Sequence, residues 1–179
     1  MKLTKLILSN FRGYKDKTEV DFSDITTFVG KNDSGKSTIL EALDIFFNDG
    51  KGCIKIDRQD VNTENNKNNE KDIAIEACFT DLPEELIIDS SHKTSLKEEY
   101  LLNEDGSLHI KKVFQGDSLK SKVYIIAKHP NNNQCNNLMQ LKISELKKKA
   151  KEIGIEDNIK DKKVSAAFRS AIWAYYDRV

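Results

Sequence analysis

The chain has 179 residues, enough for one domain or one and a half, and it can bury roughly 70% of its unfolded surface in a core. Basic and acidic residues both number 29, so the formal net charge is zero, which excludes a uniformly basic surface for nucleic acid. Hydrophobic residues make up 38% of the chain and include eight Phe, five Tyr and one Trp, so we expect a folded protein.

The cysteines Cys53, Cys78 and Cys135 are odd in number, lie far apart and form no C-x-x-C pair. This pattern indicates neither a disulfide framework nor a zinc ribbon and favours a reducing compartment. No apolar stretch approaches the roughly 20 residues of a membrane span, and residues 1–5 lead into a strand pattern rather than a signal peptide. We therefore expect a soluble, cytoplasmic protein with no membrane partner.

The first half of the chain predicts a strand, loop, helix order. Apolar runs at 3–9 and 18–22 predict two strands joined by a turn. Residues 25–29 are β-branched and aromatic without alternation, which predicts a strand buried on both faces. Apolar residues at helical spacing over 36–47 predict a helix with one face on the sheet.

The second half of the chain predicts an antiparallel meander followed by helices. Residues 48–72 are rich in Asn, Lys and Asp, and we expect a mobile loop over about 60–71. The expected strands and turns then follow in order at 73–79, 96–102, 103–106 (turn), 108–114, 116–117 (turn) and 123–127. Helical spacing predicts helices over 138–153, ending before Gly154, and over 164–176.

Residues 30–38 read GKNDSGKST and fit the phosphate-loop pattern G-x-x-x-x-G-K-S/T in full. The bare pattern would occur by chance in a chain of this length less than about once in a hundred cases, before its strand and helix context is required. The alternative is an ordinary glycine turn. The strand expected before the loop and the helix expected after it favour a phosphate site.

In such a loop the backbone amides point inward and the helix N-terminus adds partial positive charge where phosphates collect. Lys36 then meets the β- and γ-phosphates, and Ser37 is the hydroxyl that ligates Mg²⁺. The sequence therefore predicts ATP and Mg²⁺ as ligands. The predicted nucleotide-binding residues of the loop are Gly30, Asn32, Asp33, Ser34, Gly35, Lys36, Ser37 and Thr38.

A phosphate-loop NTPase also needs an acidic residue at a strand end, near the metal or the attacking water. The best candidate is Asp89, which follows three apolar residues but falls within the antiparallel region. It is either a metal-site carboxylate or an ordinary strand-end residue. No N-K-x-D motif is present, which disfavours guanine recognition.

Together, residues 8–14 (LSNFRGY), 20–22 (VDF) and 27–43 resemble the start of an ABC-type ATPase head. They are similar to the RecF and structural-maintenance-of-chromosomes (SMC) group, and above all to the overcoming-lysogenization-defect (OLD) family of ATP-dependent endonucleases. The resemblance covers about residues 1–47. It implies that Arg12 helps to hold phosphate or base and that Asn32 lies on the γ-phosphate side of the loop; the alternative for Arg12 is a solvated turn residue.

Several family features do not occur before Val179: an apolar strand ending in Asp-Glu, a Ser-Gly-Gly signature loop and a Toprim domain with its carboxylates. We therefore expect the N-terminal piece of a longer protein, which binds nucleotide weakly and turns over little by itself. The resemblance implies a second ATPase head as partner and DNA contacts made outside this chain. We assign no catalytic residue.

The remaining polar clusters have an ordinary interpretation beside a functional one. His92, His109 and His129 are widely spaced, as expected for strand or surface positions. The lysines over 142–163 could contact a nucleic-acid backbone but are also typical of a solvated helix face. Trp173, Tyr175 and Tyr176 could stack on bases, although their spacing favours a core or an interface.

The expected fold is α/β: a truncated, ABC-type phosphate-loop lobe with an antiparallel β meander over 1–130, followed by a helical C-terminal arm over 131–179. The leading functional hypothesis is the ATP-binding lobe of an OLD-like nuclease, with phage defence as its proposed role. The alternatives are an ATP-gated DNA clamp of the SMC or RecF kind and a small phosphate-loop kinase that uses Asp89.

Overall fold

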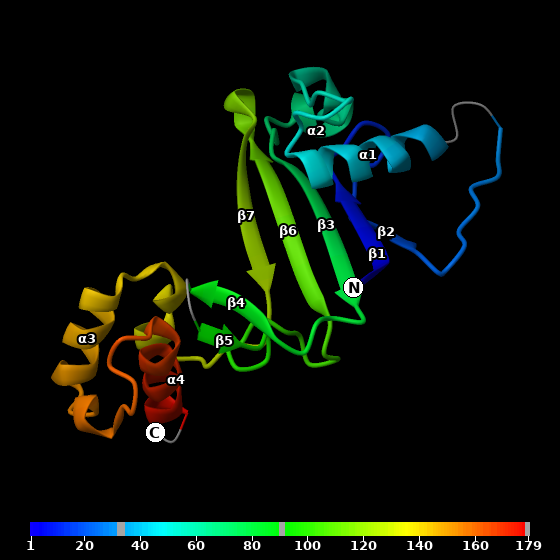
Figure 1. Ribbon diagram of the computed structural model, residues 1–179. Helices are drawn as coiled ribbons and strands as arrows, with labels where there is room; N and C mark the ends of the chain where they lie inside the picture. Colours follow the sequence, from blue (N-terminus) through cyan, green and yellow to red (C-terminus); the bar gives the residue numbers. More distant parts are fainter. Residues whose placement is uncertain (32–34, 90–91, 178–179) are drawn as a thin grey trace. The chain divides into compact units, whose positions relative to one another are not determined.

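The structure is a computed structural model that describes residues 1–31, 35–89 and 92–177 (Figure 1). The chain divides into two compact units. Unit 1 comprises Met1–Leu82 and Ser107–Ile126, and unit 2 comprises Pro83–Gly106 and Ala127–Val179. The fold is mixed α/β with an antiparallel sheet, as expected; the division after residue 130 stays a prediction.

Unit 1 is built on a five-stranded antiparallel sheet with the order β2-β1-β3-β6-β7. β3 and β6 are neighbours although residues 83–106 of unit 2 lie between them in the sequence. The strands expected over 3–9, 18–22, 73–79, 108–114 and 123–127 are confirmed. Their observed bounds are β1 Lys2–Ser9, β2 Thr18–Asp21, β3 Ile73–Thr80, β6 Leu108–Gln115 and β7 Lys120–Ile126.

One face of this sheet forms the core of unit 1. Leu6 pairs with Ala77 and Leu8 pairs with Ile75, and all four side chains are buried. Helix α1 (Lys36–Asn48) packs on this face through its apolar stripe, with the Phe46 ring centroid 6.4 Å from that of Phe79. The predicted helix over 36–47 is therefore confirmed, and burial of its stripe fixes it on the sheet.

The opposite face of the sheet carries a charged cluster. Glu76 is almost fully buried, and its carboxylate lies 2.8 Å from His109 Nε2 and 2.9 Å from Lys111 Nζ. Glu76 and Lys111 are directly opposite each other on β3 and β6. This pairing supplies the partners that a buried carboxylate requires.

Short helices occupy the polar tract between α1 and β3. They are η1 (Arg58–Asp60) and α2 (Thr63–Lys67). Asp57 and Asp60 form a capping box around η1, and Asn62 Oδ1 accepts hydrogen bonds from the first amides of α2. Caps made by Asn and Asp thus stabilise a tract with little apolar surface; its mobility stays a prediction.

The strand expected over 25–29 is not formed, and this prediction is wrong. Ile25 is 85% exposed and Val29 is 90% exposed, and no described strand pairs with this segment. Its contacts are local: Ser23 Oγ donates to the Ile25 carbonyl and Phe22 packs edge-on against Phe28. A strand needs a neighbour for its backbone groups, and composition alone does not supply one.

Unit 2 combines a two-stranded antiparallel sheet with helices. Turns over 96–100 replace the strand expected over 96–102, so that prediction is wrong; Tyr100 has a positive φ of 53°, which interrupts an extended chain. The helix expected over 138–153 is divided into η4 and α3, and the helix over 164–176 is confirmed. The elements are β4 Leu86–Asp89, β5 His92–Thr94, η3 Asn133–Cys135, η4 Leu138–Gln140, α3 Ile143–Glu152, η5 Glu156–Asn158 and α4 Ser165–Tyr176.

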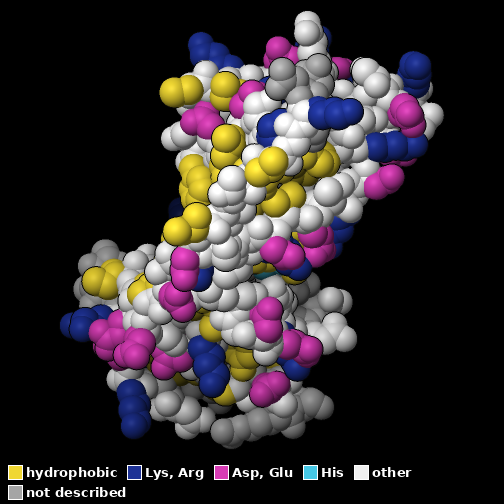
Figure 2. Space-filling view, turned by 90° about the vertical axis from the view of Figure 1, so that its right-hand side faces the viewer, with side chains coloured by type: hydrophobic (Ala, Val, Ile, Leu, Met, Phe, Trp, Pro, Cys, Tyr) yellow, Lys and Arg dark blue, Asp and Glu magenta, His cyan; other side chains and the backbone are white. Residues whose placement is uncertain are grey.

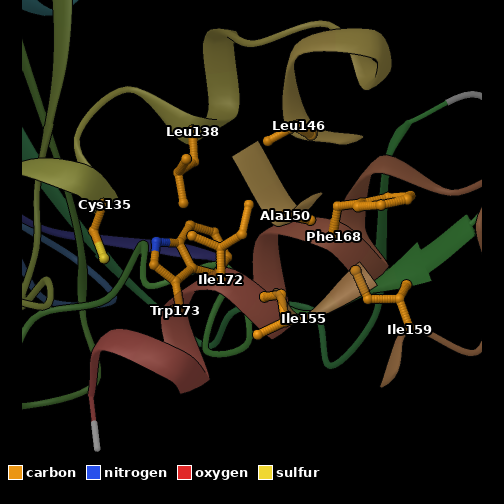
Figure 3. Close-up of a cluster of buried hydrophobic side chains, with 9 residues drawn as sticks. All are labelled: Cys135, Leu138, Leu146, Ala150, Ile155, Ile159, Phe168, Ile172 and Trp173. Carbon is orange, nitrogen blue, oxygen red and sulfur yellow. The ribbon is translucent and has the colours of Figure 1, made fainter. Parts of the chain in front are cut away.

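The helices of unit 2 enclose their own hydrophobic cluster (Figure 3). Trp173 is 1% exposed, and its indole N–H has no hydrogen-bond partner among the described residues. The cluster consists of Cys135, Leu138, Leu146, Ala150, Ile155, Ile159, Phe168, Ile172 and Trp173.

In the described ranges, no helix is both long enough and apolar enough to cross a bilayer.

A buried ion pair ties α4 to the segment that follows β5. Arg169 Nε donates to Glu99 Oε2 at 2.7 Å, and Arg169 Nη2 donates to Glu99 Oε1 at 2.8 Å. Thr94 Oγ1 donates to Glu99 Oε1 at 3.2 Å, and both charged side chains are 2% exposed. Removal of one partner would leave the other charge buried and unpaired.

We predict that Arg169→Ala lowers the free energy of unfolding by about 3–5 kcal/mol, because it leaves the Glu99 carboxylate buried without its charge partner. Urea denaturation followed by circular dichroism measures this loss. Arg58→Ala is the control, because the hydrogen bond that Arg58 makes in the described ranges is to the Asp117 carbonyl at an exposed site, and its loss is worth no more than about 0.5 kcal/mol. Equal losses for the two variants would contradict a structural role for the buried pair.

Candidate nucleotide-binding site

The loop at 30–38 leads directly into α1, and Gly35 marks the transition. Gly35 has φ 86° and ψ 4° and occupies the N-cap position, with Lys36 as the first helical residue. A Cβ at this position would lie 2.9 Å from Tyr14 Oη, which also donates a hydrogen bond to the Gly35 carbonyl at 3.3 Å. Both the backbone conformation and the close approach of Tyr14 therefore require glycine here.

The first turn of α1 is suited to an anion. Among the described residues, no side chain caps this helix end, and the first turn contains no acidic residue. The first amides of a helix lack intrahelical partners and carry the positive end of the helix dipole. Ser37 is exposed and Thr38 is half-buried in this turn. Residues Asn32, Asp33 and Ser34 lie outside the described residues.

Lys36 folds back on its own loop. Its ammonium donates to the Gly30 carbonyl at 2.8 Å and to the Lys31 carbonyl at 2.5 Å. A lysine ammonium has three donors, and carbonyl oxygens are weaker partners for it than phosphate oxygens. A bound phosphate would therefore compete with these two carbonyls for Lys36.

A hollow of about 640 Å³ adjoins Lys36 and Ser37. Its apolar walls are Phe22, Phe28 and Leu40, and the two phenylalanine rings meet edge-on with centroids 6.0 Å apart. Hydrophobic side chains gather on the upper part of the face seen in Figure 2. The polar part of the lining consists of Lys36, the Asp24 carboxylate and the hydroxyls of Ser23, Thr26, Thr27 and Ser37. The volume falls in the range of small-molecule sites, which combine apolar walls with a few polar groups.

Arg12 is positioned in the turn between β1 and β2 with a positive φ of 49°. Its Nε donates to Asp60 Oδ1 at 2.7 Å, its Nη1 donates to Glu41 Oε2, and its guanidinium carbon lies 5.1 Å from the Phe11 ring centroid. Arg12 therefore connects the first turn of the sheet to α1 and to η1. Its side chain is 29% exposed and ion-paired rather than freely solvated, and its role in nucleotide binding stays a prediction.

The two carboxylates stabilise the charged form of Arg12. Burial lowers the pKa of the guanidinium, but hydrogen bonds to Asp60 and then to Glu41 outweigh burial, so the pKa of Arg12 is raised. Glu41 lies four residues after Ser37, which places both on one side of α1. The ion pair thus anchors α1 at Glu41, one helical turn after Ser37, the predicted metal ligand.

Sequence reasoning missed Asp60 and Glu41 as partners of Arg12. The only local signal was the spacing of Asp57 and Asp60, which is typical of a cap.

Asp89 ends β4 in unit 2, and its role stays a prediction. In the part of the chain that the structure describes, no group of three or more His, Cys, Asp or Glu residues could hold a metal ion.

Comparison with known proteins places the chain in a family. A family model described as AAA ATPase domain matches residues 1–178. The chain belongs to this AAA ATPase family. Membership assigns ATP binding to the chain and accounts for the phosphate loop at 30–38.

The individual relatives are much longer than this chain. A chromosome partition protein Smc from Halobacteriovorax marinus is 48% identical over 44 residues, which are 24% of this chain and 4% of that protein. An uncharacterized protein, MJECL44, from Methanocaldococcus jannaschii is 36% identical over 114 residues, which are 63% of this chain and 31% of that protein. The SMC head domain from Thermotoga maritima superposes with a TM-score of 0.41 at 19% identity and covers 72% of this chain and 38% of that structure.

We predict that Gly35→Ala lowers the free energy of unfolding by more than roughly 1–2 kcal/mol, which is the cost of placing an alanine in the left-handed conformation. The loss is larger because the added Cβ would also lie 2.9 Å from Tyr14 Oη. Gly116→Ala in the same unit is the control, since Gly116 has φ 47° but nothing within 4 Å of its added Cβ. Thermal unfolding measures both variants. Tyr14→Phe should recover part of the Gly35→Ala loss, and a purely additive double variant would contradict the contact.

Proposed function

We propose that the chain is the ATP-binding N-terminal lobe of an OLD-like, ATP-dependent DNA endonuclease that acts in phage defence. The observation that carries the ATP site is the start of α1, where Gly35 leaves the first amides uncapped beside Lys36. The sequence resemblance over residues 1–47 supports the OLD-like assignment. ATP binding would then switch or assemble a complex with a second ATPase head, and DNA would be processed by regions outside this chain.

Mg²⁺ would accompany the nucleotide at Ser37. Mg²⁺ in nucleotide sites commonly keeps several waters and takes only one or two protein oxygens besides the phosphates. The exposed hydroxyl of Ser37 in the first turn fits this requirement. The lobe contributes binding and orientation of the nucleotide, and the hydrolytic carboxylate would come from another part of the full-length protein.

The second candidate is an ATP-gated DNA clamp without nuclease activity. Its support is the 44-residue similarity to chromosome partition Smc proteins of Halobacteriovorax marinus and Lactiplantibacillus plantarum, each 48% identical. The two candidates differ in whether the full-length protein cleaves DNA. Incubation of the full-length protein with plasmid DNA, ATP and Mg²⁺ separates them, because only the nuclease produces nicked or linear DNA.

We predict that Mg²⁺-ATP raises the melting temperature of the wild-type chain and that Lys36→Ala abolishes the rise. A ligand that binds only the folded state at 100 times its Kd adds about 2.7 kcal/mol of stability. Lys51→Ala is the matched control, because Lys51 is an exposed lysine of the same unit outside the loop. Equal shifts in the wild type and Lys36→Ala would refute the ATP site.

We predict that Arg12→Ala weakens ATP binding, since it removes the ion pair that holds α1 through Glu41 and Asp60. Calorimetric titration with Mg²⁺-ATP measures the affinity. Arg12→Lys keeps the charge but loses the forked geometry, so its affinity should be intermediate. An Arg12→Ala protein with wild-type affinity would exclude any role for Arg12 in nucleotide binding.

A further inference from the structure

A second cavity, of about 730 Å³, lies entirely within unit 2. It lies between the segment 97–106 and the segment 128–131, which join through a hydrogen bond from the Lys128 amide to the Leu102 carbonyl at 3.0 Å. Its volume falls within the 300–1,000 Å³ range of ligand sites. This cavity has no part in the site at residues 30–38.

Aromatic rings form one wall of the cavity. Tyr100 and His129 both line it, with ring centroids 6.0 Å apart, and each ring lies against Trp173, at 5.2 Å and 6.0 Å. Trp173 is buried in the hydrophobic cluster of unit 2, so it supports the two lining rings from behind. The Tyr100 and His129 rings are inclined at 60° to each other, so a planar ligand can stack on one ring and meet the other with its edge.

Tyr100 has a strained backbone conformation. Its φ of 53° is in the left-handed region, which bulky residues rarely adopt. Strain of this kind clusters at ligand clamps and switch segments. Burial raises the pKa of Tyr100 and nearby Asp177 raises it further, so the phenol stays neutral at physiological pH.

The polar side chains of the cavity have unused hydrogen-bonding capacity. Lys128 pairs with Glu104 at 2.8 Å, which neutralises both. By contrast, four lining side chains make no hydrogen bond or ion pair within the described ranges: Lys97, Asn103, Asn131 and Asp177. Together they offer one cation, one carboxylate and two amides that both donate and accept.

We propose that this cavity binds a nucleotide, with the base stacked on His129 beside Tyr100 and its phosphate met by Lys97. The amides of Asn103 and Asn131 match the mixed donor and acceptor edge of a base, and Asp177 accepts from an exocyclic amino group. Lys97, Asn131 and Asp177 are exposed and hydrated in the free protein, so an apolar ligand that displaced this water would leave them without partners. A simple anion would be repelled by Asp177 and would not use the aromatic rings. Base stacking on aromatic side chains contributes about 1–3 kcal/mol per base.

The test uses the single tryptophan of the chain as reporter, because Trp173 contacts both lining rings. Adenosine 5′-monophosphate and a single-stranded oligodeoxyadenylate of about ten nucleotides are titrated into the Lys36→Ala protein without Mg²⁺. That background removes the loop at 30–38 from the measurement, so failure here is separate from failure of the ATP site. We expect a saturable change in Trp173 fluorescence.

Variants at two exposed lining residues locate the binding. His129→Ala should weaken binding about 5- to 150-fold through lost stacking. Lys97→Ala should weaken binding and reduce the slope of log affinity against log salt concentration by the amount expected for about one phosphate contact. Lys148→Ala is the charge-matched control on α3 and should leave binding unchanged, since Lys148 is 81% exposed and does not line the cavity.

The source of the nucleotide follows from comparison of the two probes. Equal affinity for the monophosphate and the oligonucleotide identifies a free nucleotide, whereas binding of the oligonucleotide alone identifies a single strand; both support the proposal. An abasic oligonucleotide of the same length should not bind. No fluorescence response at millimolar probe, or a response that survives both His129→Ala and Lys97→Ala in folded protein, would overturn it.

Discussion

The left-handed conformation of Gly35 is the constraint on which the ATP site depends. It lets the chain turn from the loop into α1 with the first amides of the helix uncapped, and Tyr14 fits against it where a side chain would stand. Because α1 is fixed to the sheet by its apolar stripe, the position of these amides is set by the core of unit 1. The position of the phosphate-binding amides therefore depends on hydrophobic packing in the core of unit 1, away from the loop itself.

Charged contacts refine the position that packing sets. Arg12 reaches from the sheet to Glu41 on α1 and to Asp60 on η1, so three elements that are remote in sequence meet at one guanidinium. Such a network fixes the relative positions of these elements only when every member is present, because each buried or half-buried charge is stabilised by its partners. Unit 2 uses the same principle in the Arg169–Glu99 pair.

Much of the fold could be predicted because alternation and helical spacing are local signals. The strand over 73–80 and the helix over 36–48 follow from a few consecutive residues, and the loop motif is local as well. The segment 25–29 was misjudged because its composition suits a strand while pairing depends on a neighbour elsewhere in the chain. Arg12 had partners 29 and 48 residues away, and no local pattern encodes a register at that distance.

The outer edge of the sheet has a practical consequence. β7 is the last strand, no described strand pairs with its outer side, and Val123, Tyr124, Ile125 and Ile126 are all exposed. An open edge with apolar side chains is a template on which another extended chain can add. Such an edge favours self-association through β7 at high protein concentration, and a lysine or proline there would disfavour it.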